Sequence, residues 1–196
     1  MCLILSRKPI VLLSPEKRWN YADRLRKCLK RRLTVLDTEK AVAKAKNNAY
    51  ALLRSRPRSE YELRDRLRLK GYEDQVVETV IASLRLTGSV DDVKFAKFWV
   101  ESRMHMNPVG DVILRHELKA KGVQDPIIES ALEDKAKNYD EHKLALDMAE
   151  ERFRRLEKLD RRKAAKRLYD FLLRRGFKYD TVRGIIEEMI ERGSSR

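Results

Sequence analysis

Basic side chains recur at comparable places in three segments of this 196-residue chain. In each segment they share a predicted helix that ends at a glycine. Lysine and arginine gathered on one surface neutralise phosphates, so the pattern favours a polyanion such as nucleic acid as ligand. A charged helix face is also commonly only solvated, and both interpretations stay open. We call this set the predicted stripe; it consists of Arg64, Arg68 and Lys70, of Arg115, Lys119 and Lys121, and of Arg167, Arg174 and Arg175.

The other reactive side chains offer little catalytic chemistry. Asp91 and Asp92 form the one acidic pair that suggests a divalent metal, and with magnesium they would fit a structure-specific nuclease. Two adjacent acids rarely suffice for a two-metal site, and acids at a helix start are better explained by capping and by the helix dipole. His105, His116 and His142 lie on different predicted elements, without the spacing of metal ligands. The sequence therefore predicts a protein that is not an enzyme and needs no cofactor or metal.

A repeated helical motif positions the basic residues. Two leucines lie four residues apart, and a basic residue and a glycine follow at the end of the same stripe. Apolar residues six, nine and ten positions after each glycine form a second helical stripe. The glycines are 51 and 54 residues apart, so the chain is a tandem array of one unit. The copies are Leu63, Leu67, Lys70 and Gly71; Leu114, Leu118, Lys121 and Gly122; and Leu168, Leu172, Arg175 and Gly176.

Each unit is expected to contain three helices. A glycine after the leucine stripe favours a left-handed helix C-cap, so a second helix must follow it. The period leaves room for one more helix upstream, which we assign to Glu39–Arg54, Asp92–Met104 and Asp140–Lys158. The predicted fold is all-α, a tandem array of three three-helix repeats in an elongated, curved molecule. The expected boundaries are 1–38 for a basic N-terminal extension, 39–88 and 89–138 for the first two repeats, and 139–196 for the third repeat with the C-terminal tail.

Local signals predict where these helices begin and what they bury. Ser59 is a natural N-cap, and Glu62 three residues later completes a capping box. Phe95, Phe98 and Trp99 recur at helical spacing, which predicts that they lie in the core.

The composition favours a polyanionic partner. Lys and Arg number 45 against 31 Asp and Glu, and the net charge of +14 attracts nucleic acid, an acidic protein surface or an anionic membrane. Cys2 and Cys28 suggest no disulfide framework, which favours a reducing compartment. No run approaches the roughly 18 apolar residues that span a membrane. We expect a cytoplasmic monomer that does not bind membranes.

Four segments of the chain resemble the RecX family of regulatory proteins. They come in the order that the family shows, they cover roughly residues 45–190, and their combination is specific. The first forty residues do not match. The matching segments are 56–63 with Leu67, Lys70, Gly71 and Tyr72; 88–96; 116–122; and 171–177.

The resemblance implies three tandem three-helix units and a non-enzymatic negative regulator of RecA. Such proteins bind the filament that RecA forms on single-stranded DNA, and suppress its ATPase, strand-exchange and co-protease activities, which affects recombinational repair and the SOS response. The residues themselves leave open a sequence-independent nucleic-acid-binding protein without a role for RecA. Within the filament, either the DNA backbone or RecA itself could supply most of the contact.

Overall fold

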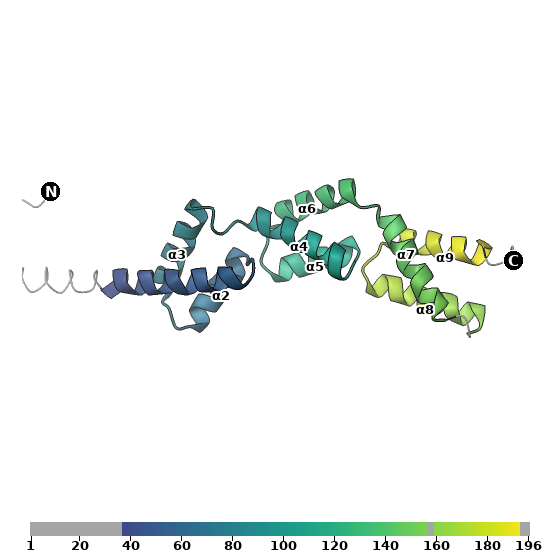
Figure 1. Cartoon of the computed structure of the whole chain (residues 1–196), viewed down its shortest axis with the longest axis horizontal. Coiled ribbons are helices and arrows are strands. Elements are labelled where there is room, and N and C mark those ends of the chain that lie inside the picture. The colour runs from purple at the N-terminus through teal and green to yellow at the C-terminus, as the bar shows by residue number, and fades with distance from the viewer. Residues whose placement is uncertain (1–36, 157–158, 193–196) are drawn as a thin grey trace, which may run out of the picture.

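The computed structural model describes residues 37–156 and 159–192, and in this part of the chain every regular element is a helix (Figure 1). The helices form three groups that follow one another along the long axis of an elongated molecule. The all-α fold of three tandem three-helix repeats is therefore confirmed. Residues 1–36 of the predicted N-terminal extension lie outside the described residues.

Three helices make up each group, which we call the first, second and third units. The middle helices of the units are the ones that carry the leucine pairs. The first unit consists of a helix over residues 37–55, α2 (Glu60–Leu69) and α3 (Asp74–Leu86); the second of α4 (Asp92–Met106), α5 (Asp111–Ala120) and α6 (Asp125–Asn138); and the third of α7 (Glu141–Arg154), α8 (Arg161–Arg174) and α9 (Tyr179–Arg192).

The glycine turn has the same geometry in all three units, which explains why a glycine recurs in the motif. Gly122 has a φ of 73°, which a side chain would disfavour. Its N–H donates to the Lys119 carbonyl at 2.9 Å, and the next N–H, of Val123, donates to the Leu118 carbonyl at 3.1 Å. These two bonds define a Schellman motif, and the turns at Gly71 and Gly176 form the same pair of bonds. The prediction of a left-handed glycine cap is confirmed in all three units.

Each unit has its own apolar core, built on the leucine pairs. The six leucines of the motif are 0–1% exposed. The residues six positions after the glycines, Val77, Ile128 and Val182, are fully buried against them. Burying a leucine or isoleucine side chain contributes about 1.5–3 kcal/mol, so these positions fix the angle between the second and third helices of each unit.

Two local predictions need correction. The first helix of the third unit ends at Arg154, short of the predicted Lys158, because Leu156 N–H donates to the Phe153 carbonyl at 2.7 Å in a tighter turn. Phe98 is not a core residue, since 45% of it is exposed, although Phe95 is buried. The apolar face of α4 is therefore narrower than the sequence indicates.

Candidate nucleic-acid interface

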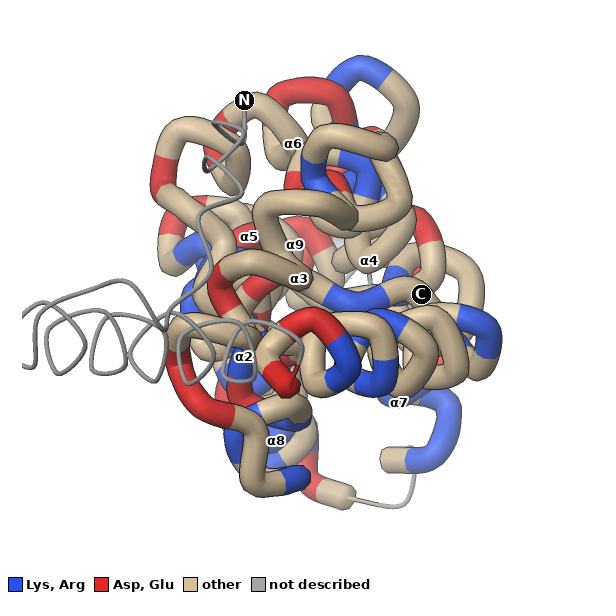
Figure 2. Tube along the Cα trace, turned by 90° about the vertical axis from the view of Figure 1, so that its left-hand side faces the viewer, with Lys and Arg blue, Asp and Glu red and all other residues tan. Residues whose placement is uncertain are grey.

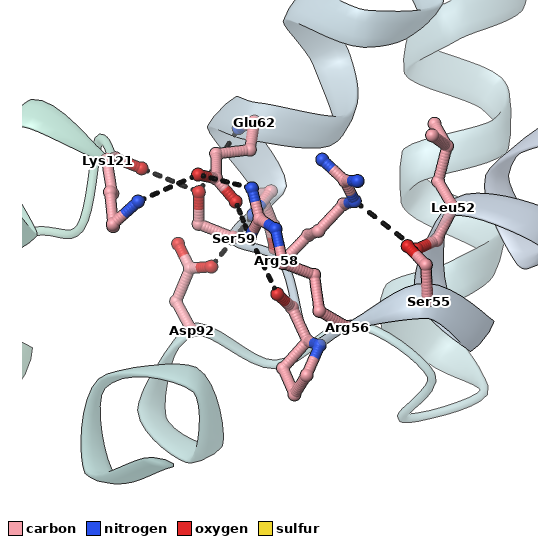
Figure 3. Close-up of polar contacts among 10 residues, drawn as sticks. Leu52, Ser55, Arg56, Arg58, Ser59, Glu62, Asp92 and Lys121 are labelled. Carbon is pink, nitrogen blue, oxygen red and sulfur yellow. Dashed lines mark hydrogen bonds and ion pairs between the residues drawn. The ribbon is translucent and has the colours of Figure 1, made fainter. Parts of the chain in front are cut away.

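The second helices of the three units, α2, α5 and α8, lie in one row, in which the start of each meets the glycine end of the next (Figure 1). At the first junction Ser59 caps α2, where its hydroxyl oxygen accepts the Glu62 N–H at 3.1 Å. The same hydroxyl donates to the Lys121 carbonyl at the end of α5, at 2.6 Å (Figure 3). Ser59 is fully buried, and its single oxygen therefore connects two units. The sequence predicts the cap but not this second bond.

The side chain of Lys121 reinforces the first junction. Its ammonium group pairs with Glu62 Oε1 at 2.9 Å and lies 4.0 Å from the centre of the Trp99 ring. Burial opposes ionisation of Glu62, but hydrogen bonds from Arg56 and Lys121 lower the pKa of this carboxyl below its ordinary value. Glu62 thus pairs with two cations instead of completing the predicted capping box. Lys121, a member of the predicted stripe, is 18% exposed and packs between units.

The acidic pair also belongs to the first junction. Asp91 caps α4, because its carboxylate accepts the N–H groups of Val93 and Lys94 at 2.9 and 3.2 Å. Asp92 accepts the N–H of Glu60 at the start of α2, at 2.9 Å. Burial raises the pKa of the Asp92 carboxyl. Both carboxylates therefore have structural roles, which favours capping over the nuclease hypothesis.

The junction between the second and third units repeats this arrangement with backbone groups alone. Gly110, the N-cap of α5, donates its N–H to the Arg175 carbonyl at 2.8 Å, and the N–H of Val112 reaches the Gly176 carbonyl at 3.3 Å. A Cβ on Gly110 would lie 2.1 Å from the Gly176 oxygen. The backbone segments around residues 110 and 176 are thus so close that only glycine fits at residue 110.

Charged side chains surround the second junction. Asp111 pairs with Lys135, which is 3% exposed, at 2.5 Å, and Glu141 lies beside this pair. Burial, together with the charge of Asp111, raises the pKa of the Glu141 carboxyl. Glu141 Oε1 is buried without a hydrogen-bond partner in the described part of the chain. The contact between the units therefore brings two carboxylates together, at a cost that Lys135 partly offsets.

Arg175 has the same role here as Lys121 has at the first junction. Its guanidinium contacts the Asn107 side chain, donates to the Pro108 carbonyl at 3.4 Å, and lies 5.4 Å from the Phe171 ring centre. Lys70, the equivalent residue of the first unit, is exposed, and its neighbour Gly71 has nothing within 4 Å of an added Cβ. The basic residue before the glycine therefore contacts the preceding unit wherever the described residues include one.

The other stripe residues of the first two units form a repeated set of ion pairs. Seven positions before the glycine, Arg64 bonds Glu78 at 2.7 Å and Arg115 bonds Glu129 at 2.9 Å. A second pair joins the basic residue three positions before each glycine to the acid three positions after it. Arg68 pairs with Asp74 at 2.7 Å, and Lys119 pairs with Asp125 at 3.0 Å. These pairs connect the second helix to the third in each unit and neutralise the basic face there. Figure 2 marks the acidic and basic positions, which are interspersed along the trace.

The third unit departs from this register. Tyr169 and Leu173 occupy the positions of the two basic residues on α8, and Arg183 and Tyr179 replace the acids on α9. The rings of Tyr169 and Tyr179 meet edge to face, with centres 6.2 Å apart, where the other units have ion pairs. Arg167 and Arg174 of the predicted stripe are exposed, but helical spacing places them on another side of α8 from Tyr169. The stripe residues thus do not share one equivalent face in all three units.

A common sequence pattern marks both junctions. Before α2 and α5 the chain has a proline, then any residue, then a small residue, and the helix begins with an acid. This pattern lies at the same distance from the glycine in both units. The residues are Pro57, Arg58, Ser59 and Glu60, and Pro108, Val109, Gly110 and Asp111. The third unit has Asp160 as N-cap before Arg161 and lacks this pattern.

The repeated junctions define a helical-repeat protein of tandem three-helix units. The family models for the first, second and third three-helix domains of RecX match residues 45–84, 91–132 and 139–186. The chain belongs to the RecX family of regulatory proteins, and is accordingly a regulator and not an enzyme.

Individual relatives agree with this assignment. The chain is 35% identical to the regulatory protein RecX of Prosthecochloris aestuarii over 79% of this chain and 96% of the relative. It is 33% identical to that of Amycolatopsis mediterranei over 78% of this chain and 87% of the relative. The crystal structure of RecX from Lactobacillus salivarius superposes with a TM-score of 0.68 at 25% identity, covering 76% of this chain and 97% of that one. None of the described helices is long and apolar enough to cross a membrane.

Proposed function

We propose that this chain is a negative regulator of RecA that binds the RecA–single-stranded DNA filament. Binding inhibits the ATPase, strand-exchange and co-protease activities of the filament, and so modulates recombinational repair and the SOS response. Family membership supports the regulatory role. The protein acts as a cytoplasmic monomer and needs no cofactor.

The observation that carries this proposal is the end-to-end row of α2, α5 and α8. These helices contain 10, 10 and 14 residues, which together amount to about 50 Å of helix. Hydrogen bonds that the Ser59 hydroxyl and the Gly110 N–H donate join them across the two junctions. A body of this length, held at its joints, has a surface long enough to contact several neighbouring subunits of a filament.

Basic residues of the predicted stripe provide the contact in this proposal. The charge of +14 attracts a DNA strand, and phosphate contacts make the affinity depend on salt. Lys70, Arg167 and Arg174 are exposed and have no ion pair among the described residues, whereas Arg64, Arg68, Arg115 and Lys119 would have to exchange their acidic partners for phosphates.

The test is the DNA-dependent ATPase of the cognate RecA, titrated with this protein. A fall in hydrolysis at well below one protein per RecA subunit is the expected result, because one elongated molecule would affect several subunits. If hydrolysis falls only when the protein is sufficient to coat all free DNA, the alternative of a sequence-independent nucleic-acid-binding protein is correct. Equal affinity for naked DNA and for the filament would support that alternative as well.

A further inference from the structure

The basic side chains of α8 have no acidic partner among the described residues, whereas Arg64 and Arg68 of α2 and Arg115 and Lys119 of α5 do. Helix α8 contains six basic residues and one acid, whereas α2 contains three of each and α5 two of each. All six are exposed, and none has an ion pair with a described carboxylate. Arg161 donates to the Ile190 carbonyl at 2.6 Å, and the side chains of the other five have no hydrogen bond among the described residues. We call these five the α8 face; they are Arg162, Lys163, Lys166, Arg167 and Arg174.

In the third unit no acid occupies the repeated ion-pair positions, on the side of α8 where helical spacing places Tyr169 with Arg162 and Lys166. In the first two units, acids of the third helix lie opposite cations of the second, and each pair cancels. In the third unit the Tyr169–Tyr179 contact connects α8 to α9 instead, so the helices stay together without acids. Asp170 is the only acid on α8, it is half-buried, and it forms no ion pair with a described residue. The third unit therefore has an uncompensated positive surface.

An additional turn at the start of α8 enlarges this surface. The helix is 14 residues long and begins four residues earlier, relative to its glycine, than α2 and α5 do. Arg162 and Lys163 belong to that turn. In the first two units this place holds the proline and the small residue that contact the following unit. The turn that would carry a further junction thus carries basic side chains.

Aromatic side chains at the edge of the α8 face indicate which polyanion fits. Tyr179 begins α9 and is 58% exposed, and its ring contacts Tyr169, which follows Lys166 by less than one turn. An exposed ring beside a row of cations suits a single strand, because unpaired bases stack on aromatic rings while cations contact the backbone. An acidic protein surface would use the cations but not the ring.

We propose that single-stranded nucleic acid binds along the α8 face, with Arg162, Lys163 and Lys166 on the phosphates and Tyr179 stacking on a base. This inference rests on the proposed function, since the strand is that of the filament, and it places the DNA contact in the third unit. It moves the main DNA contact from the predicted stripe to the α8 face, because the paired cations of the first two units would have to give up their acidic partners to contact phosphates.

The experiment measures binding of a thymidine oligonucleotide of about 15 nucleotides to the full chain at several salt concentrations. The test variant combines Arg162→Gln, Lys163→Gln and Lys166→Gln. Losing three phosphate contacts should reduce the slope of log affinity against log salt by about 2, equivalent to about 100-fold weaker binding at 0.1 M salt. Glutamine suits a helix, and circular dichroism should confirm that the variant is folded.

The matched control removes the same charge from the first two units, with Arg68→Gln, Arg115→Gln and Lys119→Gln. We expect this variant to change the slope by less than 1, because its acidic partners already cancel these cations. A control that weakens binding as much as the α8 variant, or an α8 variant that binds like the parent protein, would overturn the inference.

A second pair of variants tests the stacking role. Tyr179→Ala should weaken oligonucleotide binding about 5- to 100-fold, and Tyr179→Phe should bind like the parent protein. Loss of binding to a poly-glutamate peptide by the α8 variant, with no change for the oligonucleotide, would refute the inference in favour of an acidic protein partner. The ATPase titration with the parent protein tests the proposed function separately: if inhibition is absent while the α8 variant still loses DNA affinity, only the proposed function fails.

Discussion

Replacing Gly110 with alanine tests whether the second and third units are joined in solution as the structure shows. The backbone of Gly110 has a φ of −75° and a ψ of 169°, which alanine adopts without strain. The cost therefore comes from space alone. The added Cβ would lie 2.1 Å from the Gly176 oxygen and 2.5 Å from the Phe177 nitrogen, and both are backbone atoms that cannot rotate away.

The size of the effect follows from what must move. To make room for the Cβ, the two backbone segments must move apart by about an ångström or more. This movement breaks or stretches the hydrogen bonds from Gly110 N–H to the Arg175 carbonyl and from Val112 N–H to the Gly176 carbonyl. Each of the two bonds contributes about 1 kcal/mol, and overpacking costs about 1–3 kcal/mol, so we expect the junction to lose about 3–5 kcal/mol. In a repeat protein the interface term couples the units, so the third unit should unfold separately from the others.

The assay is urea unfolding followed by far-ultraviolet circular dichroism. The parent chain should unfold in a more cooperative transition than Gly110→Ala, for which an earlier phase is expected. The control is Gly184→Ala in α9, where nothing lies within 4 Å of the new Cβ and helix propensity favours alanine by about 1 kcal/mol. Coincident unfolding curves for the parent and Gly110→Ala would show that this junction is not closed in solution.

Three further substitutions test the cores, the buried acids and the ion pairs. Leu67→Ala should lower the unfolding free energy by about 2–5 kcal/mol, because the side chain is fully buried; an unchanged melting temperature would show that Leu67 is not a core residue. Glu141→Gln should raise the melting temperature at pH 7. The raised pKa of Glu141 means that folding disfavours its charge, so the gain is full above that raised pKa and disappears below the ordinary value of 4.5; a gain that persists at pH 4 would contradict this. Arg115→Gln should change the unfolding free energy by less than about 1 kcal/mol, since its pair with Glu129 is largely exposed; a larger loss by the same urea assay would contradict this account.

The sequence predicts the interior of each unit well because the pattern there is local. Leu63 and Leu67, the glycine cap at residue 71 and Val77 fall within one short stretch, and helical periodicity determines which side they bury. Phe98 is the one aromatic residue for which this prediction is wrong. Helical spacing is also met by residues at the edge of the apolar face, where Phe98 stays exposed.

Contacts between units are harder to predict because they join residues about sixty positions apart. Ser59 and Lys121 are ordinary capping residues when each is considered in its own unit, and only the fold brings the hydroxyl to the carbonyl. The predicted stripe shows a related difficulty. Counted from the glycine, Tyr169 and Leu173 occupy the positions that are basic in the other units. Arg167 and Arg174 are also basic, but they are not at equivalent positions.

The departure of the third unit from the repeat has a consistent physical explanation. In the first two units the start of the second helix fits the glycine turn of the next unit, where a small residue such as Ser59 or Gly110 lies. Among the described residues no glycine turn of a further unit meets the start of α8, where Arg162 and Lys163 lie. The helix pair of the third unit is connected by tyrosines instead of ion pairs, so cations there need no acidic partners. Positive charge is thus uncompensated on α8 of the third unit, and a binding surface there leaves the two described junctions intact.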